Sequence, residues 1–120
     1  MAGMTTTESK EVLDARYPTG ATTDKIAYSL NGTSAWSGLA ASNIGSYAAA
    51  TNADPSVKAN AAEILSAGCT ATGQPLYFQI QKSDGTPRGD WTLFSPAPST
   101  LSVIGDQLRH PAGTVGISLT

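Results

Sequence analysis

The second half of the chain, residues 73–120, constrains the fold most, because its apolar residues alternate with polar ones in short runs. Leu76, Phe78 and Ile80 fall on one face of an extended segment, since strand side chains change face at every position. Gly, Pro, Asp or Ser interrupts each run, and residues 83–85 (Ser-Asp-Gly) supply a tight turn after the first. The pattern predicts short strands joined by turns.

Four further runs complete a predicted strand meander that ends at the last residues of the chain. In chain order, the runs carry Trp91 with Leu93 and Phe94, then Leu101 with Val103 and Ile104, then Leu108, and finally Val115 with Ile117 and Leu119. Each run is closed by a turn signal such as Gly105-Asp106. An all-β fold is therefore expected.

The first half adds a predicted hairpin and one ambiguous segment. Residues 25–30 alternate, and Asn31-Gly32 follows, a dipeptide suited to a two-residue hairpin turn. The expected partner strand carries Ala35, Trp36 and Leu39. Residues 57–66 contain Ala, Lys and Glu, which favour a helix, whereas their length and neighbours favour a strand ending at residues 64–65. We interpret them as a strand.

The N-terminal segment predicts a short helix. Thr5 and Glu8 have the spacing of a capping box, and Pro18 stops a helix that begins there. Val12 and Leu13, with Tyr17 beyond, form its only apolar stripe. Such a helix of one or two turns must gain stability from a surface on which it packs. It is either a peripheral helix or an arm that contacts a neighbouring subunit.

Composition narrows the possible functions. The 120 residues form one domain, with an arm over 1–23 and a β-domain over 24–120. Charged residues make up 13%, about half the usual share, which lowers the cost of desolvation on docking to another protein. A net charge of −2 with scattered basic residues argues against direct nucleic-acid binding. No apolar run predicts a membrane span, and the N-terminus lacks the pattern of a signal peptide.

No residue pattern predicts an enzyme, a cofactor or a metal site. The lone His110 lacks a motif that would supply a nucleophile, so an exposed or interface histidine is expected. Cys69 is the only cysteine, and we expect it to be a small, inert, partly buried side chain. Asp84, Asp90 and Asp106 lie beside turn glycines and are expected to stabilise turns. The tryptophans are expected to fill the core.

The order of these segments resembles a family of small β-sandwich virion proteins of tailed bacteriophages, which includes capsid-decoration and tail-fibre-like proteins. The resemblance rests on IAYSLNG at 26–32, KANAAEILSAGCTATGQPLYFQI at 58–80 and STLSVIGDQLRHPAGTVGISLT at 99–120. It covers residues 24–120 and implies a single antiparallel β-sandwich, jelly-roll-like or related. The family has no catalytic residues, and the resemblance implies none here.

The resemblance implies a decoration (cement) protein, made in the host cytoplasm, that binds the outer capsid shell and stabilises it. Its expected partners are the major capsid protein and copies of itself, as a trimer or another symmetric cluster. The segment from Thr5 to Tyr17 is the expected docking element, with Glu8, Val12 and Leu13 between them. The alternatives are a tail or head fibre component and a carbohydrate-binding sandwich in which Trp36 or Trp91 stacks on a sugar.

Overall fold

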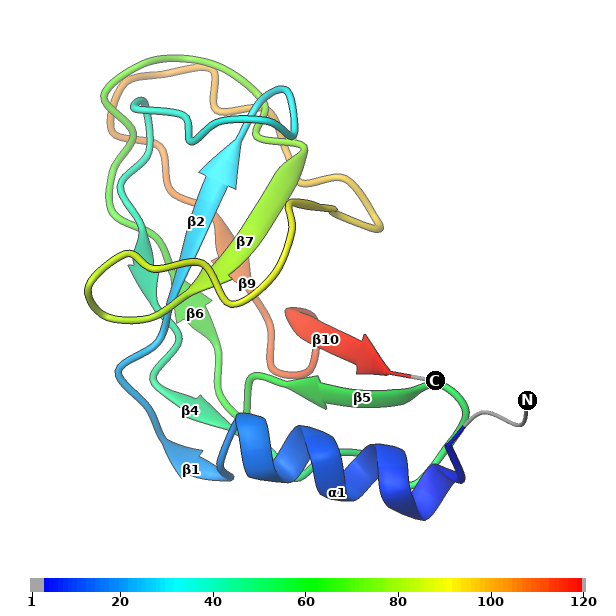
Figure 1. The fold of residues 1–120 in the computed structure, drawn as a ribbon. Helices are drawn as coiled ribbons and strands as arrows, with labels where there is room; N and C mark the ends of the chain where they lie inside the picture. Colours follow the sequence, from blue (N-terminus) through cyan, green and yellow to red (C-terminus); the bar gives the residue numbers. More distant parts are fainter. Residues whose placement is uncertain (1–3, 120) are drawn as a thin grey trace. The chain divides into compact units, whose positions relative to one another are not determined.

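The fold is taken from a computed structural model, which describes residues 4–119 (Figure 1). These residues form one helix and ten short strands: α1 (Thr6–Arg16), β1 (Gly20–Ala21), β2 (Lys25–Ser29), β3 (Ser42–Asn43), β4 (Ser46–Tyr47), β5 (Ser56–Ala59), β6 (Ile64–Leu65), β7 (Tyr77–Gln81), β8 (Thr92–Leu93), β9 (Arg109–His110) and β10 (Gly116–Leu119). The predicted all-β class with a short N-terminal helix is confirmed.

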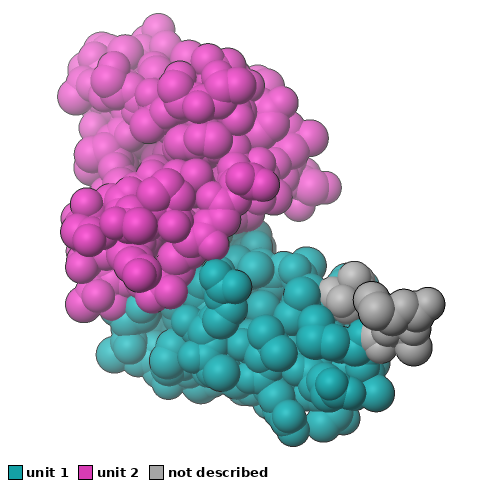
Figure 2. All heavy atoms as spheres, viewed as in Figure 1, with its two compact units in different colours: residues 1–22, 45–64, 110–120 teal, residues 23–44, 65–109 magenta. Residues whose placement is uncertain are grey.

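The chain divides into two compact units that each draw on segments far apart in the sequence (Figure 2). Unit 1 comprises residues 1–22, 45–64 and 110–120, and unit 2 comprises residues 23–44 and 65–109. The N-terminal segment thus shares a compact unit with two later segments. This grouping differs from the expected one, which separated an arm from a single β-domain.

Helix α1 begins where the capping pattern predicts and is longer than expected. The Glu8 backbone N–H donates to Thr5 Oγ1 at 3.1 Å, and the helix ends where the Tyr17 N–H donates to the Leu13 carbonyl at 2.9 Å. Its 11 residues make three turns. The expected limit of two turns was wrong because the helix packs on β5 and buries Ser9 and Leu13.

Unit 1 contains two small antiparallel sheets beside this helix. Strand β1 pairs with β4, with Gly20 opposite Tyr47. Strand β5 pairs with β10, the last strand of the chain, with Ser56 opposite Leu119. The rings of Tyr17 and Tyr47 meet edge to face with their centroids 5.7 Å apart, so the chain just after α1 packs against β4.

Unit 2 is organised around a four-stranded antiparallel sheet with the order β3-β2-β7-β8. Ile26 lies opposite Ile80, and Tyr28 lies opposite Phe78. The ring of Phe94, just after β8, packs against Phe78 at 4.8 Å between centroids. These side chains are buried and form the apolar core of unit 2.

The opposite face of this sheet is buried as well, and it is polar. Ala27, Ser29 and Gln79 alternate with the core residues, and all three are buried. The Gln79 Nε2 donates to the Gly89 carbonyl at 2.9 Å, which supplies a partner for a buried amide. Burial on both faces explains why β2 is almost wholly buried although its sequence alternates.

Strand pairing contradicts the predicted meander and the predicted hairpin. Strand β2 pairs with β7 and β3, and residues 30–39 contain no strand, so Asn31-Gly32 does not join two paired strands. Strand β10 pairs with β5, and β9 pairs with β6. The β7–β8 hairpin is confirmed. Residues 57–66 are not helical, as expected, but they contribute to two short strands, β5 and β6, in different sheets rather than to one strand.

Candidate functional site

The five residues expected to dock on a partner fall into two groups. Leu13 and Tyr17 are only 2% and 4% exposed, because they pack inside unit 1. They are therefore unavailable to a partner while that unit is folded. Thr5, Glu8 and Val12 are exposed, and Val12 presents an apolar side chain at 38% exposure.

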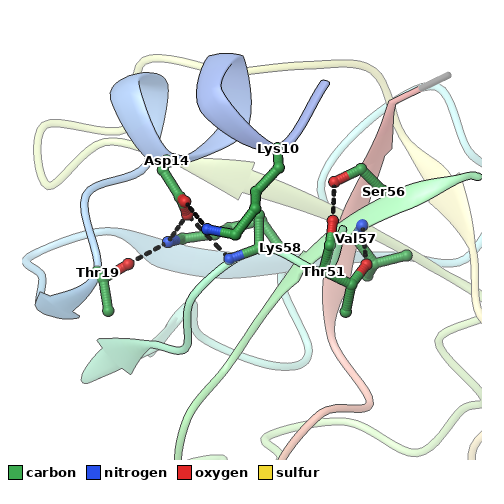
Figure 3. Close-up of polar contacts among 8 residues, drawn as sticks. Lys10, Asp14, Thr19, Thr51, Ser56, Val57 and Lys58 are labelled. Atoms are coloured by element: carbon green, nitrogen blue, oxygen red, sulfur yellow. Dashed lines mark hydrogen bonds and ion pairs between the residues drawn. The ribbon is translucent and has the colours of Figure 1, made fainter. Parts of the chain in front are cut away.

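A buried ion pair anchors α1 within unit 1 (Figure 3). Lys58, on β5, has no exposed side-chain surface, and its Nζ lies 2.8 Å from Asp14 Oδ1 on the helix. The same Nζ donates to Thr19 Oγ1 at 2.7 Å. On its outer side, Asp14 Oδ2 accepts from Lys10 Nζ at 2.6 Å. Asp14 is thus held between a buried and a half-exposed lysine.

Hydrogen bonds keep the Asp14 carboxylate ionised. The bond from Lys10, then that from Lys58, then that from the Ala50 backbone N–H at 2.9 Å hold the pKa of Asp14 well below its usual range. Lys58 Nζ has no exposed surface and contacts both Asp14 and Thr19, so it is engaged within unit 1. The cluster therefore fits a structural role, and sequence spacing gave no signal for it because the pair is 44 residues apart.

His110 is buried, which contradicts the expectation of an exposed or interface histidine. Its side chain is 6% exposed on β9, and burial lowers its pKa. The local signal that favoured exposure was Pro111, a turn residue, but strand β9 pairs with β6 immediately before it. Cys69 is also buried, at 2% exposure, and its Sγ contacts the Val103 carbonyl at 3.2 Å.

Three loops of unit 2 form a loop cluster, which comprises residues 30–39, 67–74 and 95–106 (Figure 1). Backbone hydrogen bonds connect them. The Thr70 N–H donates to the Gly38 carbonyl at 2.8 Å, and Gly73 and Leu101 exchange two bonds at 2.9 and 2.8 Å. Asp106 is the only Asp, Glu, Lys, Arg or His in these segments. The cluster is therefore an ordered, almost charge-free surface.

Within the cluster, Asp106 organises the turn at residues 101–106. Its Oδ2 accepts from the backbone N–H groups of Ser102 and Val103, both at 3.1 Å. Its own N–H donates to the Val103 carbonyl at 3.0 Å. The turn-stabilising role expected for Asp106 is thus confirmed. The strand expected around Val103 is wrong, because these bonds close a turn instead.

Neighbouring backbone fixes the same turn from the other side. The Gly105 N–H donates to the Cys69 carbonyl at 2.9 Å, and the Cys69 N–H donates to the Asp106 carbonyl at 2.8 Å. Val103 and Ile104 lie at its tip with exposures of 62% and 61%. The turn therefore presents two adjacent apolar side chains to solvent on a backbone held at several points.

The tryptophans do not fill the core as expected. Trp36 and Trp91 are both half-buried. The Trp36 indole lies so close to Gly38 that a Cβ at this glycine would overlap the ring, and a Cβ at Gly73 would lie 3.0 Å from it. Trp36 thus covers two glycines of the loop cluster while keeping part of its surface in solvent.

Neither a metal site nor a membrane span is found among residues 4–119. No three His, Cys, Asp or Glu side chains in this range are grouped to hold a metal ion. Its single helix is too short and too polar to cross a membrane. No protein-family model, curated protein or solved structure matches the chain.

Proposed function

We propose that this chain is a structural protein of a tailed-bacteriophage virion, made in the host cytoplasm, that decorates the outer capsid shell and stabilises it. Its partners in this proposal are the major capsid protein and further copies of itself in a symmetric cluster. The proposal draws on the sequence resemblance, the low charged fraction and the confirmed all-β class. One observation carries it furthest, the exposed turn at residues 101–106.

The turn is suited to docking because it is ordered before any partner binds. Val103 and Ile104 contribute little to folding while exposed, yet burying an aliphatic side chain stabilises a contact by about 1.5–3 kcal/mol. The fixed backbone means that little conformational entropy is lost on binding. A shell contact of this size is weak for one copy, and symmetric clustering would multiply it through avidity.

The strand pairings also support the finer fold proposal, an antiparallel β-sandwich of jelly-roll-like type. Strand β2 pairs with β7 and β5 pairs with β10, so both pairings join strands separated by several others. Long connections of this kind are typical of Greek-key arrangements, from which jelly rolls are built.

Co-sedimentation with capsids that lack the decoration protein tests the proposal. We expect Val103→Asp combined with Ile104→Asp to lose binding at least tenfold, because a charge at the contact centre must be desolvated. The comparison variant is Val12→Asp, which places one such carboxylate on the exposed face of α1. It keeps Asp14, which pairs with Lys58, and the buried Leu13, both of which truncation of residues 1–17 would remove.

The pattern of losses decides between two docking surfaces. Loss only in the Val103/Ile104 variant assigns docking to the loop cluster, and loss only in Val12→Asp assigns it to the helix. Wild-type protein that does not co-sediment with any capsid preparation contradicts the decoration role.

The half-buried tryptophans favour one further candidate, a carbohydrate-binding module. A sugar stacked on Trp36 or Trp91 would change the indole fluorescence on titration with glycans. The fibre alternative uses the same fold elsewhere on the virion. A density map of the intact particle separates it from shell decoration.

A further inference from the structure

Asn31-Gly32 lies in an exposed turn at the end of β2, within the loop cluster, and it carries intrinsic reactivity. We propose that Asn31 is a self-modification site, a deamidation centre, whose reaction the buried Ser29 hydroxyl holds back in the folded protein. The proposal requires no enzyme and no cofactor.

The reaction balances with water as the only co-reactant. The Gly32 backbone nitrogen loses its proton and attacks Asn31 Cγ, forming a C–N bond that closes a five-membered succinimide ring. The Cγ–Nδ2 bond breaks, and the side-chain nitrogen leaves as ammonia. Water then opens the ring to leave aspartate or isoaspartate. Glycine in the second position favours the attack, because it has no side chain to crowd the nitrogen.

In the folded turn, hydrogen bonds hold the proton of the nucleophile and fix the orientation of the Asn31 amide. The Gly32 N–H donates to Ser29 Oγ at 3.0 Å, so its proton is held by a buried oxygen. Asn31 Oδ1 accepts from the backbone N–H groups of Thr33 at 2.9 Å and Ser34 at 3.2 Å. Ring closure must turn the Asn31 amide away from these donors. The turn therefore has to open before the chemistry proceeds.

Ser29 is the group through which the turn is held. Its side chain is 0% exposed, and its Oγ lies 3.1 Å from Asn31 Oδ1 and 3.3 Å from the Asn31 N–H. The same hydroxyl donates to the Ser34 carbonyl. Removing this oxygen leaves several polar groups of the turn without their partner, at a cost of about 1–3 kcal/mol. That cost lowers the free energy needed to open the turn.

Deamidation would alter the surface on which the proposed function depends. No residue from 26 to 53 carries a charge, so a carboxylate at position 31 would be the first in that stretch. The formal net charge would fall from −2 to −3. We expect the modified protein to dock more weakly on the shell, because a new charge raises the desolvation cost of the loop cluster. This expectation rests on the proposed decoration role.

Mass spectrometry of the protein tests, without any partner, whether the folded turn slows deamidation of Asn31. Native protein and protein in concentrated urea are incubated at mildly alkaline pH, and conversion of Asn31 to aspartate or isoaspartate is followed by peptide mapping. We expect at least tenfold slower conversion in the native sample, since a tenfold reduction needs an opening free energy of only about 1.4 kcal/mol. Ser29→Ala should convert roughly tenfold faster than wild type when native.

The matched control is Thr33→Ala, which keeps the backbone donor to Asn31 and changes an exposed side chain. It should convert at the wild-type rate, and all three proteins should convert equally in urea. Equal rates for native and unfolded wild type overturn the proposal that the folded turn slows the reaction, and this test needs no folded variant. A folded Ser29→Ala protein that reacts no faster than wild type overturns it as well. Loss of capsid docking in unmodified protein would overturn only the proposed function.

Discussion

Helix α1 of unit 1 and the loop cluster of unit 2 are held in place by different interactions. Unit 1 holds its helix with an ion pair whose lysine is fully buried, Asp14 with Lys58. The loop cluster of unit 2 is held by backbone hydrogen bonds and packing, with a single charged residue, Asp106, used inside a turn. An ion pair with a buried lysine thus anchors the helix, whereas the loop cluster is held almost without charge.

This difference bears on which surface is available for binding. An ion pair that fixes α1 to β5 uses the helix for folding, and leaves only its outer residues for a partner. In the loop cluster, by contrast, the side chains of Val103 and Ile104 are mostly exposed and remain available to a partner. In unit 2 the charges lie elsewhere, as in the 2.9 Å pair between Asp24 and Arg88.

The largest expected effect comes from breaking the anchor of unit 1. Asp14→Ala removes the carboxylate that pairs with the buried Lys58 and leaves its Nζ bonded to Thr19 Oγ1, so we expect a loss of about 3–5 kcal/mol in the free energy of unfolding. Urea titration followed by far-UV circular dichroism measures it. The helix signal reports on unit 1, and fluorescence reports on unit 2, which contains both tryptophans.

The matched control for Asp14→Ala is Lys10→Ala. Lys10 bonds the same carboxylate, but its side chain is 35% exposed, so its loss should cost less than about 1 kcal/mol. Similar effects for both variants would contradict the claim that the buried lysine, not the surface pair, anchors the helix.

The response to pH should differ between the two units. Burial raises the pKa of Tyr28, in unit 2, to about 12 from 10.0. The unfolded chain then releases its proton first as pH rises, so stability present below pH 10 is lost between pH 10 and 12. The shift corresponds to about 2–3 kcal/mol. Tyr28→Phe should flatten this alkaline loss, as measured by the urea midpoint at each pH.

Unit 1 should respond in the opposite direction. The pKa values of Asp14 and His110 are both lowered in the fold. Their contributions are therefore present above the unfolded values of 3.8 and 6.5 and decline as pH falls through each. The helix signal should weaken on acidification, and Asp14→Asn should reduce its dependence on pH below 3.8. For the alkaline range, a loss of stability between pH 10 and 12 that persists in Tyr28→Phe would show that Tyr28 of unit 2 is not its cause.

Local sequence signals predicted the elements whose causes are local. Thr5 and Glu8 set the start of α1, and the Asp84-Gly85 turn joins two paired strands. The length of the helix was missed because its anchor, Lys58, is distant in sequence. The partner of β2 was missed for the same reason, since β7 lies about fifty residues further along.

Turn chemistry misled the prediction where a side chain competes with strand pairing. Asn31-Gly32 has the composition of a hairpin turn, yet Ser29 Oγ and Asn31 Oδ1 take up the backbone donors and close a local loop. Val103 and Ile104 have strand-forming side chains, but Asp106 closes a turn around them. The sequence therefore predicted a strand at Val103 and Ile104 and not the exposed turn that forms the candidate docking surface.

Packing within the loop cluster gives the next largest effect. Gly38→Ala would force a Cβ into the Trp36 indole, and overpacking of this kind costs about 1–3 kcal/mol. Gly89→Ala is the matched control, because its Cβ would meet nothing within 4 Å and its backbone is not left-handed. Urea titration and the Trp36 fluorescence of both variants measure the effect. Equal stabilities of the two variants would show that the Trp36 indole can move aside at little cost in free energy.

The smallest expected effect concerns the exposed turn itself. Ile104→Ser removes an apolar side chain that is 61% exposed, so stability should change by no more than about 0.5 kcal/mol. Asp106→Ala removes the acceptor of two backbone N–H groups beneath it and should cost about 1 kcal/mol or more. This contrast separates the backbone that orders the turn from the side chains it presents. A large loss of stability in Ile104→Ser would mean that the apolar tip contributes to folding. The main argument for the loop cluster as a docking surface would then be contradicted.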